Sequence, residues 1–346
     1  MELNHKRIVV TFLMHLGDVI LTTPFMYVLR QAAPDSHITY VMDEKLKDVM
    51  LYNPYIDEII TVDKKGKDNS IGALYRIARN IHCKVQPDVV INLHPNERTS
   101  FLAWAIGAKK TVGMSHFLFR PWMTTYTRLD RRTRHAADMY INVLEQLKVP
   151  IVPNKGLQIF SCPQWQSTVD DLYEAQGVSA SDTLVGFNVG SAVPEKRWPK
   201  ERFAAIADTL ADEGYVPVFF GGPMDEEMVA EVVAGMSHTP IIMTGRLGLG
   251  ELAEAIKRCR LFITNDSGPM HVAVSQQVPV VALYGPSNPK FYGPYTTKCI
   301  VLEAMTDYEI GQSMKQIIRE GKYKGLGVIS EETVLEAAHT LLQKQE

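Results

Sequence analysis

Cysteine is scarce in this chain: four of the 346 residues are cysteines, they lie far apart, and no C-x-x-C pair occurs. This pattern excludes a disulfide framework and a zinc site built on closely spaced cysteines, so we expect a reducing compartment. The N-terminal segment lacks the long apolar core of a signal peptide, and no apolar run approaches the length that spans a bilayer. We therefore predict a cytoplasmic protein, which can still touch a membrane surface.

An excess of one charge is also lacking. The formal net charge is -3, which gives no general case for binding nucleic acid. No group of His, Asp, Glu and Cys has the spacing of metal ligands, and no convincing Asp-x-Asp pair is present. We therefore predict neither a bound metal nor another cofactor. A hydrophobic content of 46% and a charged content of 22% fit a soluble globular enzyme.

A glycine-rich dinucleotide fingerprint is missing as well. The turn after the first predicted strand, Thr11–Asp18, contains Gly17 alone in place of G-x-G-x-x-G. That turn needs several glycines to approach a pyrophosphate closely, so a nicotinamide or flavin oxidoreductase is disfavoured.

Predicted strands and helices alternate almost throughout, which indicates parallel sheets covered on both faces. Before a break near Val149–Pro163 we predict strands at Arg7–Phe12, His37–Met42, Glu58–Val62 and Asp88–Asn92, and helices at Asp18–Ala32, Ile71–His82, Thr99–Ile106 and Ala136–Leu147. After it we predict strands at Leu184–Asn188, Val216–Phe220, Ile241–Met243, Leu261–Thr264 and Val278–Tyr284, and helices at Glu201–Glu213, Asp225–Met236, Gly250–Cys259 and Glu331–Gln343.

Two such blocks of similar size predict two Rossmann-like domains that face each other across a cleft. We assign residues 1–155 to the first domain and 156–325 to the second. Residues 326–346 form a separate segment, because the final helix of such pairs often crosses back to the first domain. Ser330 is the expected N-cap of that helix.

The segment Asn265–His271 joins a buried strand directly to a helix and predicts an anion site. Gly268 allows close approach of the backbone, Ser267 offers a hydroxyl, and a helix N-terminus offers unpaired N–H groups with a favourable dipole. Asp266 precedes them, and His271 falls on the first helical turn, within reach of the same anionic ligand. The next strand ends at the same rim in Gly285–Pro289, and phosphate is the expected guest.

Three charged residues at predicted strand ends each allow two interpretations. Asp18 is either a helix N-cap or a general base at the cleft. Lys196, beside Arg197, is either part of a solvated surface pair or a group that neutralises a diphosphate. Asp225 either caps its helix or binds ribose hydroxyls, and the loop Thr244–Gly248 could contact a base.

The segment Lys109–His135 is locally basic. An anionic second substrate or a membrane surface would explain it, although most charged residues of such a run are simply solvated. His135 stands at the start of a predicted helix and is interpreted as its N-terminal cap. The basic residues are Lys109, Lys110, Arg120, Arg128, Arg131, Arg132 and Arg134, set against Asp130, with Trp122 and Tyr126 among them and Arg98 earlier.

Taken together, these motifs resemble glycosyltransferase family 9, the ADP-heptose:lipopolysaccharide heptosyltransferases. The matching pieces are Leu16–Pro24, Lys196–Pro199, Asn265–His271 and Leu283–Pro289, which occur in the family's order. The resemblance runs from the first strand to about Pro294. It implies a GT-B fold of two Rossmann-like domains, with the acceptor bound mainly by the first and the nucleotide sugar by the second.

The resemblance also implies roles for single residues. It makes Asp18 the catalytic base, and Gly17, Arg98, Arg120 and Arg128 acceptor-binding residues. The implied donor site consists of Ser191, Lys196, Asp225, Leu247, Asp266, Ser267, Gly268 and His271. Two positions depart from the family pattern: Asp225 is shorter than the glutamate expected near it, and Ala192 stands where a hydroxyl residue can occur.

The activity implied is inverting, metal-independent transfer of a heptose from ADP-heptose to the anionic lipopolysaccharide inner core. Asp18 would accept the proton of the attacking hydroxyl, and the protein would work against the cytoplasmic face of the inner membrane, without nucleic acid as a partner. Two alternatives stay open. Another GT-B nucleotide-sugar enzyme, such as an epimerase, would need further acid/base groups, and a non-catalytic binding module would tolerate the loss of Asp18.

Overall fold

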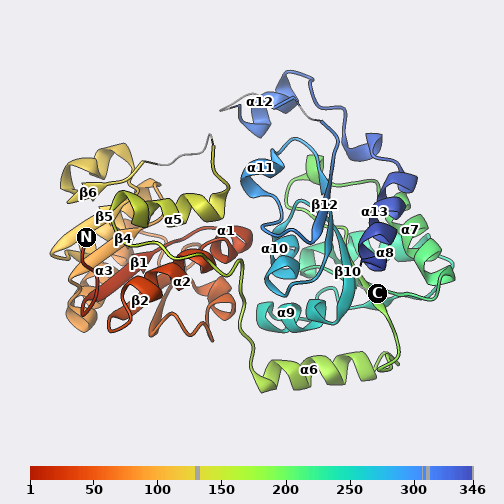
Figure 1. Cartoon of the computed structure of the whole chain (residues 1–346), viewed down its shortest axis with the longest axis horizontal. Coiled ribbons are helices and arrows are strands. Elements are labelled where there is room, and N and C mark those ends of the chain that lie inside the picture. Colours follow the sequence, from red (N-terminus) through yellow and green to blue (C-terminus); the bar gives the residue numbers. More distant parts are fainter. Residues whose placement is uncertain (129–132, 306, 309–311, 345–346) are drawn as a thin grey trace. The chain divides into compact units, whose positions relative to one another are not determined.

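The computed structural model describes residues 1–128, 133–305, 307–308 and 312–344. Contacts divide the chain into two units, Met1–Phe160 and Ser161–Glu346. Each unit holds a six-stranded sheet with helices packed around it (Figure 1), and every strand pair within both sheets is parallel. The predicted α/β class with parallel sheets is confirmed. Asp130, Arg131 and Arg132 of the basic segment lie outside the described residues.

The sheet of the first unit has the order β3-β2-β1-β4-β5-β6. Its strand order reverses between β1 and β4, and in open parallel sheets ligands bind at such a switch point beyond the carboxyl ends of the strands. The strands are β1 (Arg7–Thr11), β2 (His37–Asp43), β3 (Glu58–Val62), β4 (Val89–Asn92), β5 (Lys110–Gly113) and β6 (Thr125–Tyr126). The helices are α1 (Leu16–Ile20), α2 (Thr23–Ala32), α3 (Ile71–Val85), α4 (Glu97–Ile106) and α5 (Ala136–Gln146), with 3-10 helices η1 (Glu44–Val49) and η2 (Phe117–Trp122).

The single helix predicted over Asp18–Ala32 is wrong, because two helices occupy this stretch. Pro24 has no N–H and stands in the first turn of α2, so a continuous helix would lose a backbone hydrogen bond there. The hydroxyls of Thr22 and Thr23 donate instead to the carbonyls of Val19 and Ile20, at 2.7 and 2.8 Å. The short helix α1 therefore has its own end.

The strand β5 and the edge strand β6 were not predicted. They fall inside the basic segment, where Lys110 opens β5 and the alternation of apolar residues is short. Pairing between strands, and not local composition, defines both of them. The strand β5 pairs with β4, and the two residues of β6 pair with β5. Pairing with an already formed parallel sheet overrides a weak local pattern.

The sheet of the second unit has the order β12-β11-β10-β7-β8-β9, and its switch point lies between β7 and β10. The strands are β7 (Leu184–Asn188), β8 (Val216–Phe220), β9 (Ile241–Ile242), β10 (Cys259–Asn265), β11 (Val280–Tyr284) and β12 (Cys299–Glu303). The helices are α6 (Pro163–Glu174), α7 (Lys200–Asp212), α8 (Glu226–Ala234), α9 (Leu249–Lys257), α10 (Gly268–Ser275), α11 (Pro289–Tyr292), α12 (Met314–Arg319) and α13 (Glu331–Gln343). Three 3-10 helices complete the unit: η3 (Pro194–Lys196), η4 (Pro223–Asp225) and η5 (Leu326–Val328).

The last helix, α13, packs within the second unit; the sequence alone left open whether it crosses to the first domain. Val334, Ala338 and Leu342 of α13 are buried in one cluster with Val281 and Leu283 of β11. The predicted cap is confirmed, because the Ser330 hydroxyl accepts from the Thr333 N–H at 3.2 Å. The apolar face of α13 thus completes the core of the second unit.

None of the helices in the described ranges is long and apolar enough to cross a membrane.

Gly113, the last residue of β5, lies very close to the backbone of the neighbouring strand β4. Its φ is +103°, and a Cβ there would lie 2.4 Å from the Asn92 carbonyl oxygen of β4. Gly156, in the same unit, has a φ of +74° but a Cβ there would meet nothing within 4 Å. Alanine substitutions at the two positions therefore distinguish the cost of an unfavourable φ from the cost of a steric clash.

We expect Gly113→Ala to lower the free energy of unfolding by about 3 kcal/mol, from an unfavourable φ together with a backbone clash. Gly156→Ala should cost about 1 kcal/mol, from φ alone. Urea unfolding of both variants and the parent, followed by circular dichroism, measures the difference. Equal losses for the two variants would show that the approach of β5 to Asn92 carries no cost.

Candidate functional site

Buried asparagines at the ends of β7 and β10 fix the two loops that begin at the switch point of the second unit. The Asn188 side-chain amide donates to the Gly190 carbonyl at 3.0 Å and to the Ser267 hydroxyl at 2.9 Å. The Asn265 amide donates to the Val189 carbonyl at 2.8 Å, and its oxygen accepts from the Trp198 N–H at 3.0 Å. These cross-links satisfy buried polar groups and hold the loops after β7 and β10 against each other.

An ion pair lies at the centre of these loops. Lys196 Nζ is 2.5 Å from Asp266 Oδ2, and the Ser287 hydroxyl donates to the same oxygen. The Lys196 and Asp266 side chains are only 18% and 9% exposed, so Lys196 is not a solvated surface lysine. Ser191 joins the cluster through a hydroxyl that donates to the Asp266 carbonyl at 3.3 Å. The structure thus brings together Ser191, Lys196, Asp266 and Ser267, as predicted.

Three tyrosines surround this cluster and remain neutral donors. Burial, followed by the nearby Asp266 carboxylate, raises the pKa of Tyr284 well above its usual range, and burial raises the pKa of Tyr323 to about 12. The Tyr323 hydroxyl donates to the Glu195 carbonyl at 2.6 Å, next to Lys196. Tyr308, whose pKa burial also raises, donates to the Gly285 carbonyl at 2.9 Å. Because the phenols carry no charge, they do not compete with Asp266 for the Lys196 ammonium.

The helix that follows Asp266 begins as predicted. Gly268 and Pro269 form the first positions of α10, and Ser267 stands at the N-cap without a side-chain bond to the helix. His271 is the fourth helical residue and is 5% exposed. The first N–H groups of a helix lack partners within it and carry a partial positive charge. This helix start lies immediately after the carboxylate that holds Lys196.

The interpretation in which the Asp225 side chain caps α8 is wrong. Its carboxylate accepts from the Gly222 N–H at 2.9 Å, and no side-chain cap bond to α8 is present. It also lies against the end of β7, because a Cβ at Gly190 would be 2.2 Å from Asp225 Oδ1. The next residue, Glu226, was missed: its Oε1 would be 2.0 Å from a Cβ at Gly245, in the loop that leads to the half-buried Leu247.

In the first unit Asp18 lies in the first turn of α1, which begins at Leu16. The N-cap is His15, so the interpretation of Asp18 as the N-cap is wrong. Gly17 precedes it, and both residues are partly exposed. A carboxylate in this turn is favoured by the helix dipole.

Lys64 and Asp43 hold the loop that leads to Asp18, and sequence reasoning missed both. Lys64 Nζ lies 2.9 Å from Asp43 Oδ2 and donates to the carbonyls of Met14 at 3.0 Å and Leu13 at 3.3 Å. Asp43 ends β2 and Lys64 follows β3, so three neighbouring strand ends are tied together. Their positions within two residues of the ends of two predicted strands were the available signal.

The three arginines predicted to bind an acceptor have separate surroundings. Arg98 donates to the Asn69 side chain at 2.6 Å and to the Asp68 carbonyl at 3.3 Å. The Arg120 guanidinium lies 4.4 Å from the centre of the Tyr126 ring. The Arg128 side chain is exposed, while its backbone N–H donates to Gln146.

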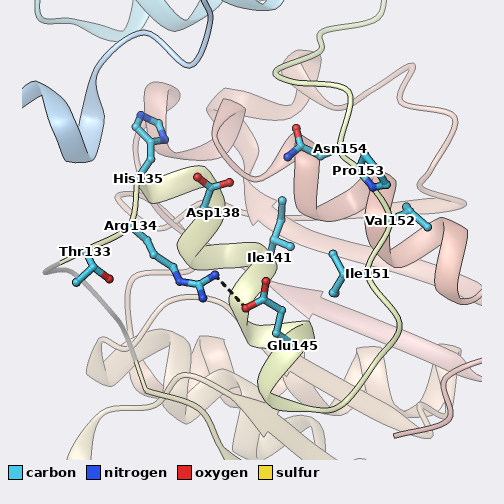
Figure 2. Close-up of a pocket in the computed structure, with 10 residues that line it drawn as sticks. All are labelled: Thr133, Arg134, His135, Asp138, Ile141, Glu145, Ile151, Val152, Pro153 and Asn154. Atoms are coloured by element: carbon cyan, nitrogen blue, oxygen red, sulfur yellow. Dashed lines mark hydrogen bonds and ion pairs between the residues drawn. The ribbon is translucent and has the colours of Figure 1, made fainter.

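A cavity of about 480 Å³ lies at the start of α5, and Figure 2 shows its lining side chains. The side chains of Ile141, Ile151 and Val152 form an apolar side of the cavity. Elsewhere in its lining, the Arg134 guanidinium pairs with the Glu145 carboxylate at 2.9 Å. His135 caps α5, as predicted, because its Nδ1 accepts from the Ala137 N–H at 3.2 Å.

Among the residues that the structure describes, no group of three or more His, Cys, Asp or Glu could hold a metal ion.

The chain is similar to several known proteins. Residues 75–323 match the family model described as glycosyltransferase family 9 (heptosyltransferase). A solved glycosyl transferase family 9 structure from Veillonella parvula is 66% identical with a TM-score of 0.97, and the match covers 99% of both chains. The Escherichia coli structure of ADP-heptose lps heptosyltransferase II is 23% identical with a TM-score of 0.80, over 98% of this chain and 99% of that one.

A curated relative, lipopolysaccharide heptosyltransferase 3 of Escherichia coli K12, is 26% identical over 94% of this chain and 95% of its own length. The family model alone covers more than half of the sequence. The chain therefore belongs to glycosyltransferase family 9, the heptosyltransferase family, and its two parallel sheets form a GT-B fold.

Proposed function

We propose that this glycosyltransferase moves a heptose from ADP-heptose to the lipopolysaccharide inner core, with inversion and without a metal, at the cytoplasmic face of the inner membrane. The observation that carries the donor half of the proposal is the enclosed Lys196–Asp266 pair beside the start of α10. Family membership supports heptose transfer over an epimerase or a non-catalytic binding module.

The donor diphosphate is proposed to bind where Lys196, Ser191 and the first N–H groups of α10 converge. An ammonium and a helix N-terminus both favour the charge that grows on departing ADP, and they stabilise it more strongly where water is excluded. Ser267, Gly268 and His271 would complete this phosphate loop. Asp266 would set the position of the Lys196 ammonium rather than contact the phosphates, because two like charges repel.

The adenosine end is proposed to lie beside the next two strand ends. Asp225 lies between Gly190 and Gly221, and Glu226 lies against Gly245. Their carboxylates would accept hydrogen bonds from the ribose hydroxyls. Leu247 would pack on the adenine. The longer Glu226 compensates for the short Asp225 that the sequence presents near the family's glutamate.

Acceptor binding is assigned to the first unit. Arg98, Arg120 and Arg128 would attract the carboxylates and phosphates of the inner core, since guanidinium groups form charge-assisted hydrogen bonds with both. Gly17 would let the acceptor approach α1. Asp18 would accept the proton of the acceptor hydroxyl as its oxygen attacks the anomeric carbon and the bond from that carbon to the ADP oxygen breaks.

We expect Asp18→Asn to lower kcat by about 100- to 10,000-fold, the usual contribution of a general base, while ADP affinity stays unchanged. Release of ADP from ADP-heptose in the presence of acceptor, with excess EDTA, measures kcat. The matched control is Asp35→Asn, whose side chain is 61% exposed. Turnover retained by Asp18→Asn would remove Asp18 from the base role, and loss of parent activity in EDTA would refute the metal-free mechanism.

We expect Lys64→Met to lower kcat by about 10- to 100-fold, because the loop before Asp18 loses its tie and small misplacements of a reacting group are costly. KM for donor and the affinity for ADP should change little, which a general loss of folding would not produce. Lys67→Met is the control: it lies in the same loop, is 72% exposed and pairs with Glu44. Equal kcat for both variants and the parent would show that Lys64 does not position Asp18.

A further inference from the structure

The first unit exposes a cluster of large apolar side chains, which we call the aromatic patch: Trp104, Phe117, Leu118 and Trp122. They are 41%, 62%, 52% and 58% exposed. Trp104 belongs to α4, and the other three belong to η2, which packs on α4. Single exposed apolar residues are ordinary, but a contiguous group marks an interaction surface.

Aromatic contacts join the two tryptophans of the patch on a shared base, and Phe117 and Leu118 belong to the same short helix as Trp122. The ring centre of Trp104 is 6.0 Å from that of Trp122, and Phe119 lies 6.3 Å from Trp104 and 6.2 Å from Trp122. Phe101 contacts Trp104 and Phe119 from α4, at 5.8 and 6.2 Å. The patch is therefore built on a packed base, so little ordering is needed when it meets a partner.

The chain segment that carries most of the patch is basic. Residues 107–128 contain four basic residues, Lys109, Lys110, Arg120 and Arg128, and no Asp or Glu. The neighbouring carboxylates face basic groups: Glu97 lies 3.6 Å from the His116 ring, and Asp88 lies 2.9 Å from Lys109 Nζ. The surroundings of the patch thus suit a partner of negative charge.

The Trp122 side of the patch lies near Lys110, one of these basic residues. The Thr124 N–H donates to the Thr111 carbonyl at 2.7 Å, and the Thr111 N–H donates to the Thr124 hydroxyl at 3.2 Å. These bonds tie the chain just after Trp122 to the start of β5, directly after Lys110. Tryptophan beside lysine is the combination typical of segments that sit at the headgroup level of a bilayer.

We propose that the aromatic patch docks the protein on an anionic phospholipid bilayer. Trp104, Phe117, Leu118 and Trp122 enter the interfacial layer, and Lys110 meets the headgroup phosphates. Apolar area supplies affinity that salt does not screen, and the basic residues add a salt-dependent part. The proposal rests on the proposed function only in that a lipid-anchored acceptor lies at such a surface.

Flotation of the full chain with vesicles tests the proposal. The parent should bind vesicles that contain phosphatidylglycerol, less at high salt, and weakly those of phosphatidylcholine alone. Phe117→Ser/Trp122→Ser should reduce partitioning by about ten-fold or more, since two large side chains lose their burial. Lys110→Gln should reduce it by about five-fold, on anionic vesicles only.

The matched control is Ile71→Ser/Tyr75→Ser on α3, which removes two side chains that are 72% and 49% exposed outside the patch. It should bind like the parent. All variants should transfer heptose to a delipidated, water-soluble core acceptor at the parent rate, so failure of docking is distinguishable from failure of the proposed reaction. Thermal unfolding checks that each variant is folded.

Three results would overturn docking on a bilayer. The parent could fail to bind anionic vesicles, the patch variant could bind as well as the parent, or the α3 control could lose as much binding as the patch variant. If the parent instead forms dimers that the patch variant abolishes, without binding vesicles, the patch is an interface between two copies of this chain.

Discussion

The ion pair between Lys196 and Asp266 is the constraint on which the proposed donor site depends. Taking two charges out of water is costly, and such pairs seldom add stability over apolar residues. This pair is sustained by the Ser287 hydroxyl on the carboxylate and by loops that the Asn188 and Asn265 amides cross-link. A charge held at such cost beside a helix start is better explained by ligand chemistry than by folding.

The two units use the same device at their sheet edges. In the first, Lys64 follows β3 and pairs with Asp43 at the end of β2; in the second, Lys196 follows β7 and pairs with Asp266 after β10. In both, a buried asparagine at a strand end, Asn92 or Asn188, hydrogen bonds to the neighbouring loop. Polar groups at the carboxyl ends of parallel strands thus become rigid supports for residues that would otherwise lie on mobile loops.

The sequence predicted those parts of the fold whose signal is local. Leu184–Asn188, Val216–Phe220 and Glu331–Gln343 were predicted with the bounds that the structure shows, since each is a clear apolar run or a capped amphipathic helix. Lys196, Asp266 and Ser191 could be predicted to converge because parallel strands end at one rim. Lys64 could not be predicted to contact Leu13 and Met14, because that contact depends on the β1-β2-β3 order, which no local pattern encodes. The strand β6 and the tyrosines around Asp266 depend on the same kind of long-range placement.

We claim above all that the carboxyl edge of the second sheet binds ADP without a metal, with Lys196 on the diphosphate and a separate contact to the adenine. Calorimetric titration of the full chain with ADP, UDP and GDP in excess EDTA tests it most directly. We expect ADP to bind at least about ten-fold more tightly than UDP or GDP, and Lys196→Met to weaken ADP binding by a similar factor. Equal affinity for the three nucleotides, or ADP binding that survives loss of the Lys196 ammonium, would contradict it.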